Sequence, residues 1–239
     1  MLALLTLLAF GRDSTPKVVP KAPPVKITAD AGFVSATGNT SVQTLNLGDK
    51  FSARVHGFTF SQQFGVVHGS SGGETVASSW QNLFRTDMVL HADVGAYASV
   101  TVERNVLSGV SSRVGTVTGL SAQLLKTKTD RLVLEGGVSI TSQRGTDANA
   151  EDQDFLGGRA ATSFTHQIGP RASIGQSLEV LPNFREGADL RINTETSLLA
   201  PFTHRAAVKL TYVIHYDGVP EPGFLSTDRL FTSGIQVTL

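Results

Sequence analysis

Hydrophobic and polar residues alternate with a period of two along most of the chain. Near the C-terminus, for example, Phe231, Ile235 and Val237 fall on one face of an extended chain, while Thr232 and Gln236 fall on the other. A β-strand places successive side chains on opposite sides, whereas a helix repeats every 3.6 residues. The pattern therefore predicts amphipathic β-strands, with no helical stretch between them.

Twelve segments carry this alternation, and polar or glycine-rich residues separate them. We expect strands at residues 27–36, 41–54, 57–68, 75–87, 93–103, 113–125, 131–143, 155–167, 171–181, 188–200, 206–216 and 228–239.

The length of these segments distinguishes a membrane barrel from a soluble sheet. Most run to about eleven residues or more, whereas strands of soluble proteins average about five or six. A tilted strand needs about nine to eleven residues to cross a bilayer. The sequence therefore predicts an all-β protein, a closed antiparallel up-and-down transmembrane β-barrel of about twelve strands.

The connections between the segments alternate in length, as they do in bacterial outer-membrane barrels with short periplasmic turns and longer outer loops. The short connections are 126–130, 168–170 and 201–205, and the longer ones are 69–74, 104–112, 144–154 and 217–227. The turn at 37–40 is short where a longer loop is expected. An even number of strands places both termini on the periplasmic side.

The N-terminal residues divide into two parts before the barrel. Residues 1–11 form an apolar, signal-like segment with a candidate cleavage site at Ala9-Phe10-Gly11. Residues 12–26 are rich in Pro and Lys, which is typical of an extended periplasmic linker. The barrel then occupies residues 27–239.

Composition narrows the range of functions. The chain has 20 Lys and Arg against 20 Asp and Glu, so no net field favours nucleic acid. Only 17% of residues are charged, which is low for a cytosolic surface. The chain has no cysteine, which excludes disulfides, thiol catalysis and cysteine-ligated metals.

Three stretches carry a family resemblance: AGFVSATGNT at 31–40, QSLEVLP at 176–182 and ETSLLAPFT at 195–203. Together they resemble the family of salt-induced outer-membrane proteins, a bacterial domain of largely unknown function. The resemblance covers residues 27–239 and implies a location in the outer membrane of a Gram-negative-type bacterium. It implies no catalytic residue, because no activity of the family can be attached to particular positions.

Charged residues gather on the inward-facing positions of the predicted strands. These lumen-lining candidates are Lys50, Arg85, Glu103, Arg113, Glu135, Arg159, Glu179, Arg191, Glu195 and Lys209. Opposite charges on facing strands stabilise pairing, so one interpretation is a set of salt bridges that fill the barrel. The other is a charged constriction or solute-binding surface.

Hairpin geometry predicts which of these charges meet. Glu103 should face Arg113 across the loop at 104–112. Glu179 should face Arg191 or lie one position away from it. Glu195 and Lys209 should come together diagonally across the turn at 201–205. Asp49 is the main charged residue on the otherwise nearly uncharged outward faces.

No set of residues assembles a catalytic, metal or cofactor site. His68 and Ser70 have the His-x-Ser spacing of outer-membrane acyl-hydrolases, but Ser70 falls in a predicted Gly/Ser loop. His215 and Asp217 are only two potential metal ligands, and a third is missing. The acidic residues of one loop do not have EF-hand spacing; they are Asp147, Glu151, Asp152 and Asp154.

The leading functional interpretation is a non-enzymatic outer-membrane barrel, either a narrow pore or a protein of envelope and osmotic adaptation. The osmotic part rests on the family name. Expected partners are outer-membrane lipid and lipopolysaccharide, the barrel-assembly machinery, and small ions or solutes, with no nucleic acid and no cofactor. One alternative is an enzyme acting on lipid or lipopolysaccharide, which needs a His/Ser/acid cluster. Another is an exported soluble ligand-binding barrel, which needs shorter strands and a charged outer face.

Overall fold

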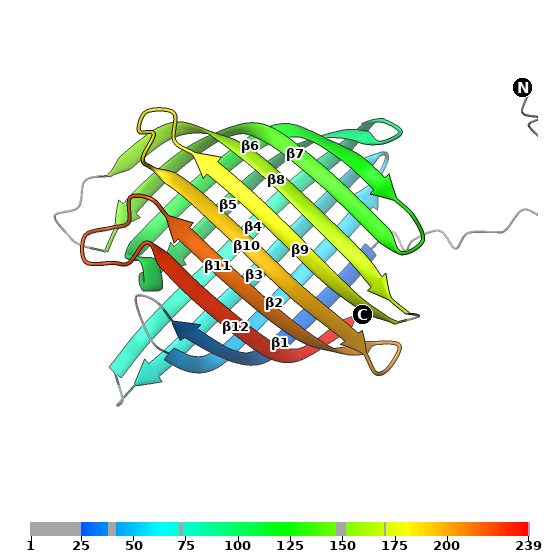
Figure 1. The fold of residues 1–239 in the computed structure, drawn as a ribbon, viewed down its shortest axis with the longest axis horizontal. Coiled ribbons are helices and arrows are strands. Elements are labelled where there is room, and N and C mark those ends of the chain that lie inside the picture. The colour runs from blue at the N-terminus through cyan, green and yellow to red at the C-terminus, as the bar shows by residue number, and fades with distance from the viewer. Residues whose placement is uncertain (1–24, 38–41, 72–73, 147–151, 170, 239) are drawn as a thin grey trace, which may run out of the picture.

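The computed structural model describes residues 25–37, 42–71, 74–146, 152–169 and 171–238. Nearly all of these residues belong to twelve strands (Figure 1). The strands are β1 (Val25–Thr37), β2 (Val42–Val55), β3 (Phe58–Ser71), β4 (Glu74–His91), β5 (Val94–Asn105), β6 (Val110–Lys126), β7 (Asp130–Gly145), β8 (Gln153–Ile168), β9 (Ala172–Pro182), β10 (Leu190–Pro201), β11 (Ala206–Asp217) and β12 (Thr227–Thr238).

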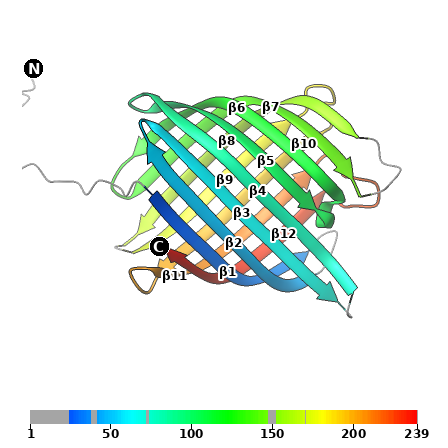
Figure 2. The same cartoon turned by 180° about the vertical axis from the view of Figure 1, so that it is seen from behind.

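The strands form one closed barrel in which each pairs antiparallel with its neighbour in the sequence. Closure comes from β1 and β12, which pair from Thr28 opposite Thr238 to Thr37 opposite Arg229. The strands run obliquely to the barrel axis, as both views show (Figures 1 and 2). Closure leaves no unpaired edge, so every strand exchanges backbone hydrogen bonds on both sides.

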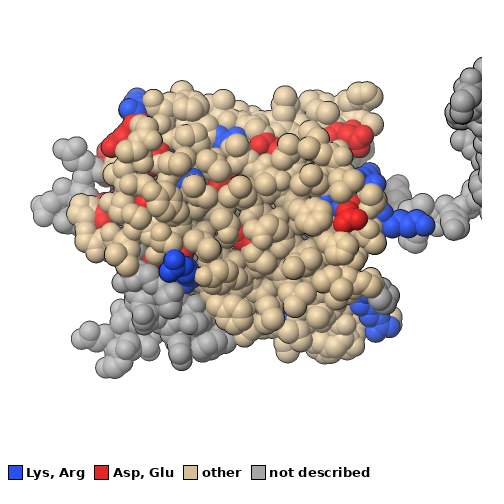
Figure 3. Space-filling model, viewed as in Figure 1, with Lys and Arg blue, Asp and Glu red and all other residues tan. Residues whose placement is uncertain are grey.

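The distribution of apolar side chains is inverted relative to a soluble domain. Large hydrophobic residues project outward and stay exposed, for example Phe84 (51%), Leu120 (57%) and Ile140 (62%). The few buried hydrophobic residues among those described include Tyr97 and Phe155. In Figure 3, the outer face is mostly uncharged, and charged side chains gather towards the two ends.

The twelve-strand barrel predicted from the alternation is confirmed, and most strand ends fall within three residues of the expected positions. β1 begins at Val25, inside the segment predicted as linker. A short 3-10 turn, η1 (Val106–Ser108), interrupts the predicted loop at 104–112. Residues 1–24 and the 38–41 part of the first outer turn lie outside the described residues.

The described residues include no helix long and apolar enough to cross a membrane, a finding that does not bear on strands.

Candidate functional site

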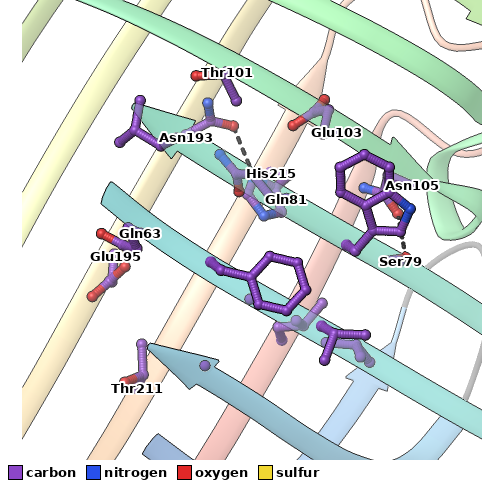
Figure 4. A pocket seen from close by; sticks show the side chains of 18 of the residues that line it. Gln63, Ser79, Gln81, Thr101, Glu103, Asn105, Asn193, Glu195, Thr211 and His215 are labelled. Atoms are coloured by element: carbon purple, nitrogen blue, oxygen red, sulfur yellow. Dashed lines mark hydrogen bonds between the residues drawn. The ribbon is translucent and has the colours of Figure 1, made fainter. Parts of the chain in front are cut away.

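The interior of the barrel contains a cavity of about 710 Å³. Because side chains alternate along each strand, the positions between the outward apolar residues project into this space. Nine of the ten charged positions singled out in the sequence line the cavity, and Glu135 lies beside it in contact with Arg85 and Arg159. Figure 4 shows part of the lining, including Gln63, Glu195 and Thr211.

One wall of the interior carries a chain of alternating charges. Arg85 on β4 contacts Glu135 on β7 at 2.7 Å and Asp87 at 2.6 Å. Arg159 on β8 contacts the other oxygen of Glu135 at 2.6 Å and Glu179 on β9 at 2.6 Å. Each guanidinium thus bridges two carboxylates, and the network links β4 to β9 across the inside of the barrel.

Tyr97 on β5 fills the space inside this wall. Its side chain is only 3% exposed, and the Arg85 guanidinium stacks on its ring at 4.2 Å. Arg159 donates a hydrogen bond to the Tyr97 hydroxyl at 2.8 Å. A buried tyrosine usually finds such a partner for its hydroxyl. This half of the barrel is therefore filled with paired charges and an aromatic ring.

A second set of contacts crosses the lumen near the ends of the strands that carry the longer loops. Glu103 and Arg113 face each other on β5 and β6, as expected, and form an ion pair at 2.6 Å. Arg113 also donates to Gln143 at 2.6 Å, and Gln143 in turn donates to Glu221 at 2.8 Å. Glu221 belongs to the loop between β11 and β12, half-way round the barrel from β5 and β6.

The loop at residues 218–226 therefore reaches over the mouth of the barrel. The Phe224 ring lies against Gly109, which has a positive φ of 74° beside η1. Asp228, at the start of β12, accepts a hydrogen bond from Ser108 in η1 at 2.9 Å. These contacts narrow the opening at this end.

The opposite wall is less completely paired. Lys209 on β11 contacts Asp30 on β1 at 3.0 Å, and Gln236 donates to the second oxygen of Asp30 at 2.9 Å. Within the described part of the chain, Lys50 and Glu195 make no ion pair. Both line the cavity together with the uncharged Gln63 and Thr211. This side leaves open space bordered by Lys50 and Glu195, a cation and an anion without an ion pair among the described residues. Figure 4 shows Glu195 beside Gln63.

One of the expected charge contacts, between Glu195 and Lys209, is not formed. Glu195 lies opposite Val213 while Lys209 lies opposite Leu199, so the two charges are too far apart along the hairpin to meet. The predicted diagonal contact is wrong because the turn between β10 and β11 sets a different register, and Lys209 instead reaches across β12 to Asp30.

Glu179 lies opposite Asn193, one inward position from Arg191, which was one of the two expected arrangements. Its carboxylate accepts hydrogen bonds from Arg159 and Asn193. Arg191 is 9% exposed, bonds to Thr141 at 3.3 Å and stacks on Phe155 at 5.4 Å. Arg191 therefore contributes to filling the interior.

The weaker candidates do not form a reaction centre among the described residues. Ser70 lies in β3 instead of the predicted loop, at a bulge in its pairing with β4. His215 faces the interior and hydrogen-bonds to Asn193 at 2.8 Å. Of the acidic loop, Asp152 pairs with Arg144 at 3.0 Å, while Asp147 and Glu151 lie outside the described residues. No group of three potential metal ligands occurs in the described ranges.

Several important interior residues were not singled out in the sequence. Tyr97, Asp30 and Gln143 occupy inward positions, so the period-two pattern could have included them. Glu221 lies in a loop, where no periodicity marks its direction. Selecting interior residues by charge alone missed part of the site, because the Tyr97 ring and side-chain amides such as Gln143 complete the interior hydrogen-bond networks.

Comparison with known proteins agrees with this architecture. The family model described as "Protein of unknown function, DUF481" matches residues 29–239. The solved structure of the NanC porin has a TM-score of 0.61 at 13% sequence identity, covering 89% of this chain and 100% of that chain. The KdgM porin in complex with disordered oligogalacturonate has a TM-score of 0.50 at 12% identity, covering 88% and 98%. No curated protein matches the chain.

Proposed function

The chain belongs to the family described as Protein of unknown function, DUF481, and we propose that it forms a narrow, non-enzymatic pore in a bacterial outer membrane. The observation that carries this proposal is the inverted barrel, with apolar side chains exposed outside and a charged, partly open interior. Only helices and closed barrels satisfy their backbone groups in lipid. An apolar outer surface of this extent is suited to hydrocarbon and costly in water.

The orientation of the barrel is part of the proposal. Short turns lie at one end, such as residues 56–57 between β2 and β3, and the same end holds Val25 and Thr238. In a Gram-negative-type envelope these short turns and both termini face the periplasm. The loop at 218–226 then covers the outer mouth. Outer-membrane lipid and lipopolysaccharide surround the barrel, and the barrel-assembly machinery inserts it.

The interior suggests which solutes pass. The wall from β4 to β9 is filled by Tyr97 and by the ion pairs of Arg85 and Arg159. Solutes therefore move along the side that carries Lys50 and Glu195. Paired charges largely cancel one another's field, whereas free charges attract or repel a passing ion. Lys50 and Glu195 carry opposite charges on this side, so together they provide no strong overall preference. Small hydrophilic ions and solutes are therefore the proposed cargo.

Single-channel recording of the refolded protein in a planar bilayer tests the pore. We expect discrete, salt-dependent conductance steps from a preparation whose gel migration changes on heating. Glu195→Gln should raise anion over cation permeability, and Lys50→Gln should do the reverse, each on the order of twofold. The matched control is Asp152→Asn, because Asp152 is 59% exposed outside the lumen.

The outcomes separate the parts of the proposal. A folded barrel without conductance would contradict the pore. If the barrel conducts but neither Glu195→Gln nor Lys50→Gln changes its ion selectivity, the pore proposal stands. Only the placement of the passage beside Lys50 and Glu195 is then contradicted.

A further inference from the structure

A polar cluster interrupts the apolar outer face of the barrel. Asp49 on β2, Gln62 on β3 and Asn82 on β4 share the outward parity with Phe51, Phe60 and Phe84. The three phenylalanines are 37%, 45% and 51% exposed, which identifies this as the outside face. Strands β2 to β5 lie side by side on this face (Figure 2).

The polar groups lie well inside their strands, away from the rims. Asp49 is near the middle of β2 (Val42–Val55), and Asn82 is near the middle of β4 (Glu74–His91). Asp49 and Asn82 flank Phe64 in one row across the sheet. In the membrane location proposed above, on which this inference rests, such positions face hydrocarbon, where ionisable and polar side chains are costly.

Hydrogen bonding within the chain satisfies only part of this cluster. Gln62 donates its amide to the Asn82 carbonyl at 3.0 Å. The Asn82 amide nitrogen and the Asp49 carboxylate have no hydrogen-bond partner in the part of the chain that the structure describes. Among the described residues, the face therefore offers one free carboxylate acceptor on β2 and one free amide donor on β4, in the same row and separated by β3.

An apolar groove runs beside the polar groups. It has a volume of about 510 Å³, and its lining includes Phe51, Phe60, Phe84 and Val100. The same phenylalanines that line the groove also project from the surface. The face thus has both a recess and protruding rings, in addition to both a donor and an acceptor.

We propose that the β2–β5 outer face is the interface of a homodimer within the membrane, where Asp49 of each copy accepts a hydrogen bond from Asn82 of the other. A twofold interface brings one surface against itself, so the surface must be self-complementary. The face meets this requirement in two ways. The Asp49 acceptor of one copy can meet the Asn82 donor of the other, and the phenylalanine rings of one copy can enter the groove of the other. A second copy replaces lipid with hydrogen-bonding partners for groups that hydrocarbon leaves unsatisfied.

Cross-linking in lipid vesicles tests the interface, and the absence of native cysteine makes single-cysteine variants clean probes. Phe60 lies within the face, whereas Leu178 is 39% exposed on β9, on another side of the barrel. With a short bismaleimide, we expect Phe60→Cys to give covalent dimers and Leu178→Cys to remain monomeric. A monomeric Phe60→Cys protein, or equal cross-linking of both variants, would overturn the proposal.

A second variant tests the polar contact without relying on a reporter cysteine in the face. Asp49→Leu should weaken dimerisation in vesicles by about tenfold, since two symmetry-related hydrogen bonds are lost. Energy transfer between N-terminally labelled copies measures this change. The matched control is Gln176→Leu, because Gln176 is an exposed outward polar residue on β9, hydrogen-bonded to Thr196 within the chain at 2.6 Å. Equal dimerisation of Asp49→Leu and the unsubstituted protein would overturn the assigned contact.

Insertion is scored first by heat-modifiable migration and protection from added protease. A chain that does not insert overturns the membrane location and the dimer together. An inserted chain that stays monomeric overturns the dimer alone and leaves the pore proposal standing.

Discussion

At the scale of single residues, the surroundings decide what each charge does. Arg159 is 15% exposed and holds two carboxylates and the Tyr97 hydroxyl. The Arg144 side chain, by contrast, is 68% exposed, and its one ion pair among the described residues is with Asp152. Exposed pairs contribute little to stability, whereas removing one partner of a buried network leaves other charges uncompensated.

Arg159→Ala should therefore lower the free energy of unfolding by about 1–3 kcal/mol, the cost of leaving buried partners unsatisfied. Arg144→Ala is the matched control and should change it by less than about 0.5 kcal/mol. Urea unfolding in vesicles, followed by the fluorescence of the single Trp80, measures both. Similar losses for the two variants would show that the interior network does not stabilise the barrel.

At the scale of strands, close backbone approach matters most where the barrel closes. Gly32 on β1 and Gly234 on β12 face each other in the closing pair. A Cβ atom built on Gly234 would overlap the carbonyl oxygen of Ala31, so a side chain there requires the strands to move apart. Gly65 on β3 has nothing within 4 Å of the same position.

Gly234→Val should reduce the yield of folded barrel, because the β1–β12 ladder cannot close around the added side chain. Gly65→Ala should fold as the unsubstituted chain does. The fraction of protein that migrates as the compact, unheated form on a gel provides the comparison. Normal folding of Gly234→Val would mean that the closing strands tolerate a shift that the structure does not show.

At the scale of the whole molecule, contacts across the lumen set the size of the passage. The loop at 218–226 is tied to the far wall by Gln143 and Glu221 and by Phe224 against Gly109. Deeper in the barrel, Tyr97 and the ion pairs of Arg85 and Arg159 fill the side formed by β4 to β9. The passage that remains open to solutes is therefore narrower than the backbone of a twelve-stranded barrel alone would allow.

Deleting residues 220–225 should raise the single-channel conductance on the order of twofold, since the mouth loses its cover. Glu221→Ala should produce a smaller increase by freeing the loop from Gln143. Glu186→Ala is the matched control, because Glu186 is an exposed acid in the neighbouring loop between β9 and β10. A conductance that the deletion leaves unchanged would place the limiting constriction deeper, at Tyr97.

The sequence by itself determined the strands, their inward and outward faces, and the pairing of Glu103 with Arg113. Strand periodicity and hairpin pairing are local properties, and neighbours in the sequence are neighbours in this barrel. The tertiary structure alone decided that Arg85 meets Glu135, that Lys209 meets Asp30 and that Glu221 crosses to Gln143. Those contacts join strands that are not adjacent, and they depend on the curvature and stagger of the closed sheet, which accumulate over all twelve strands.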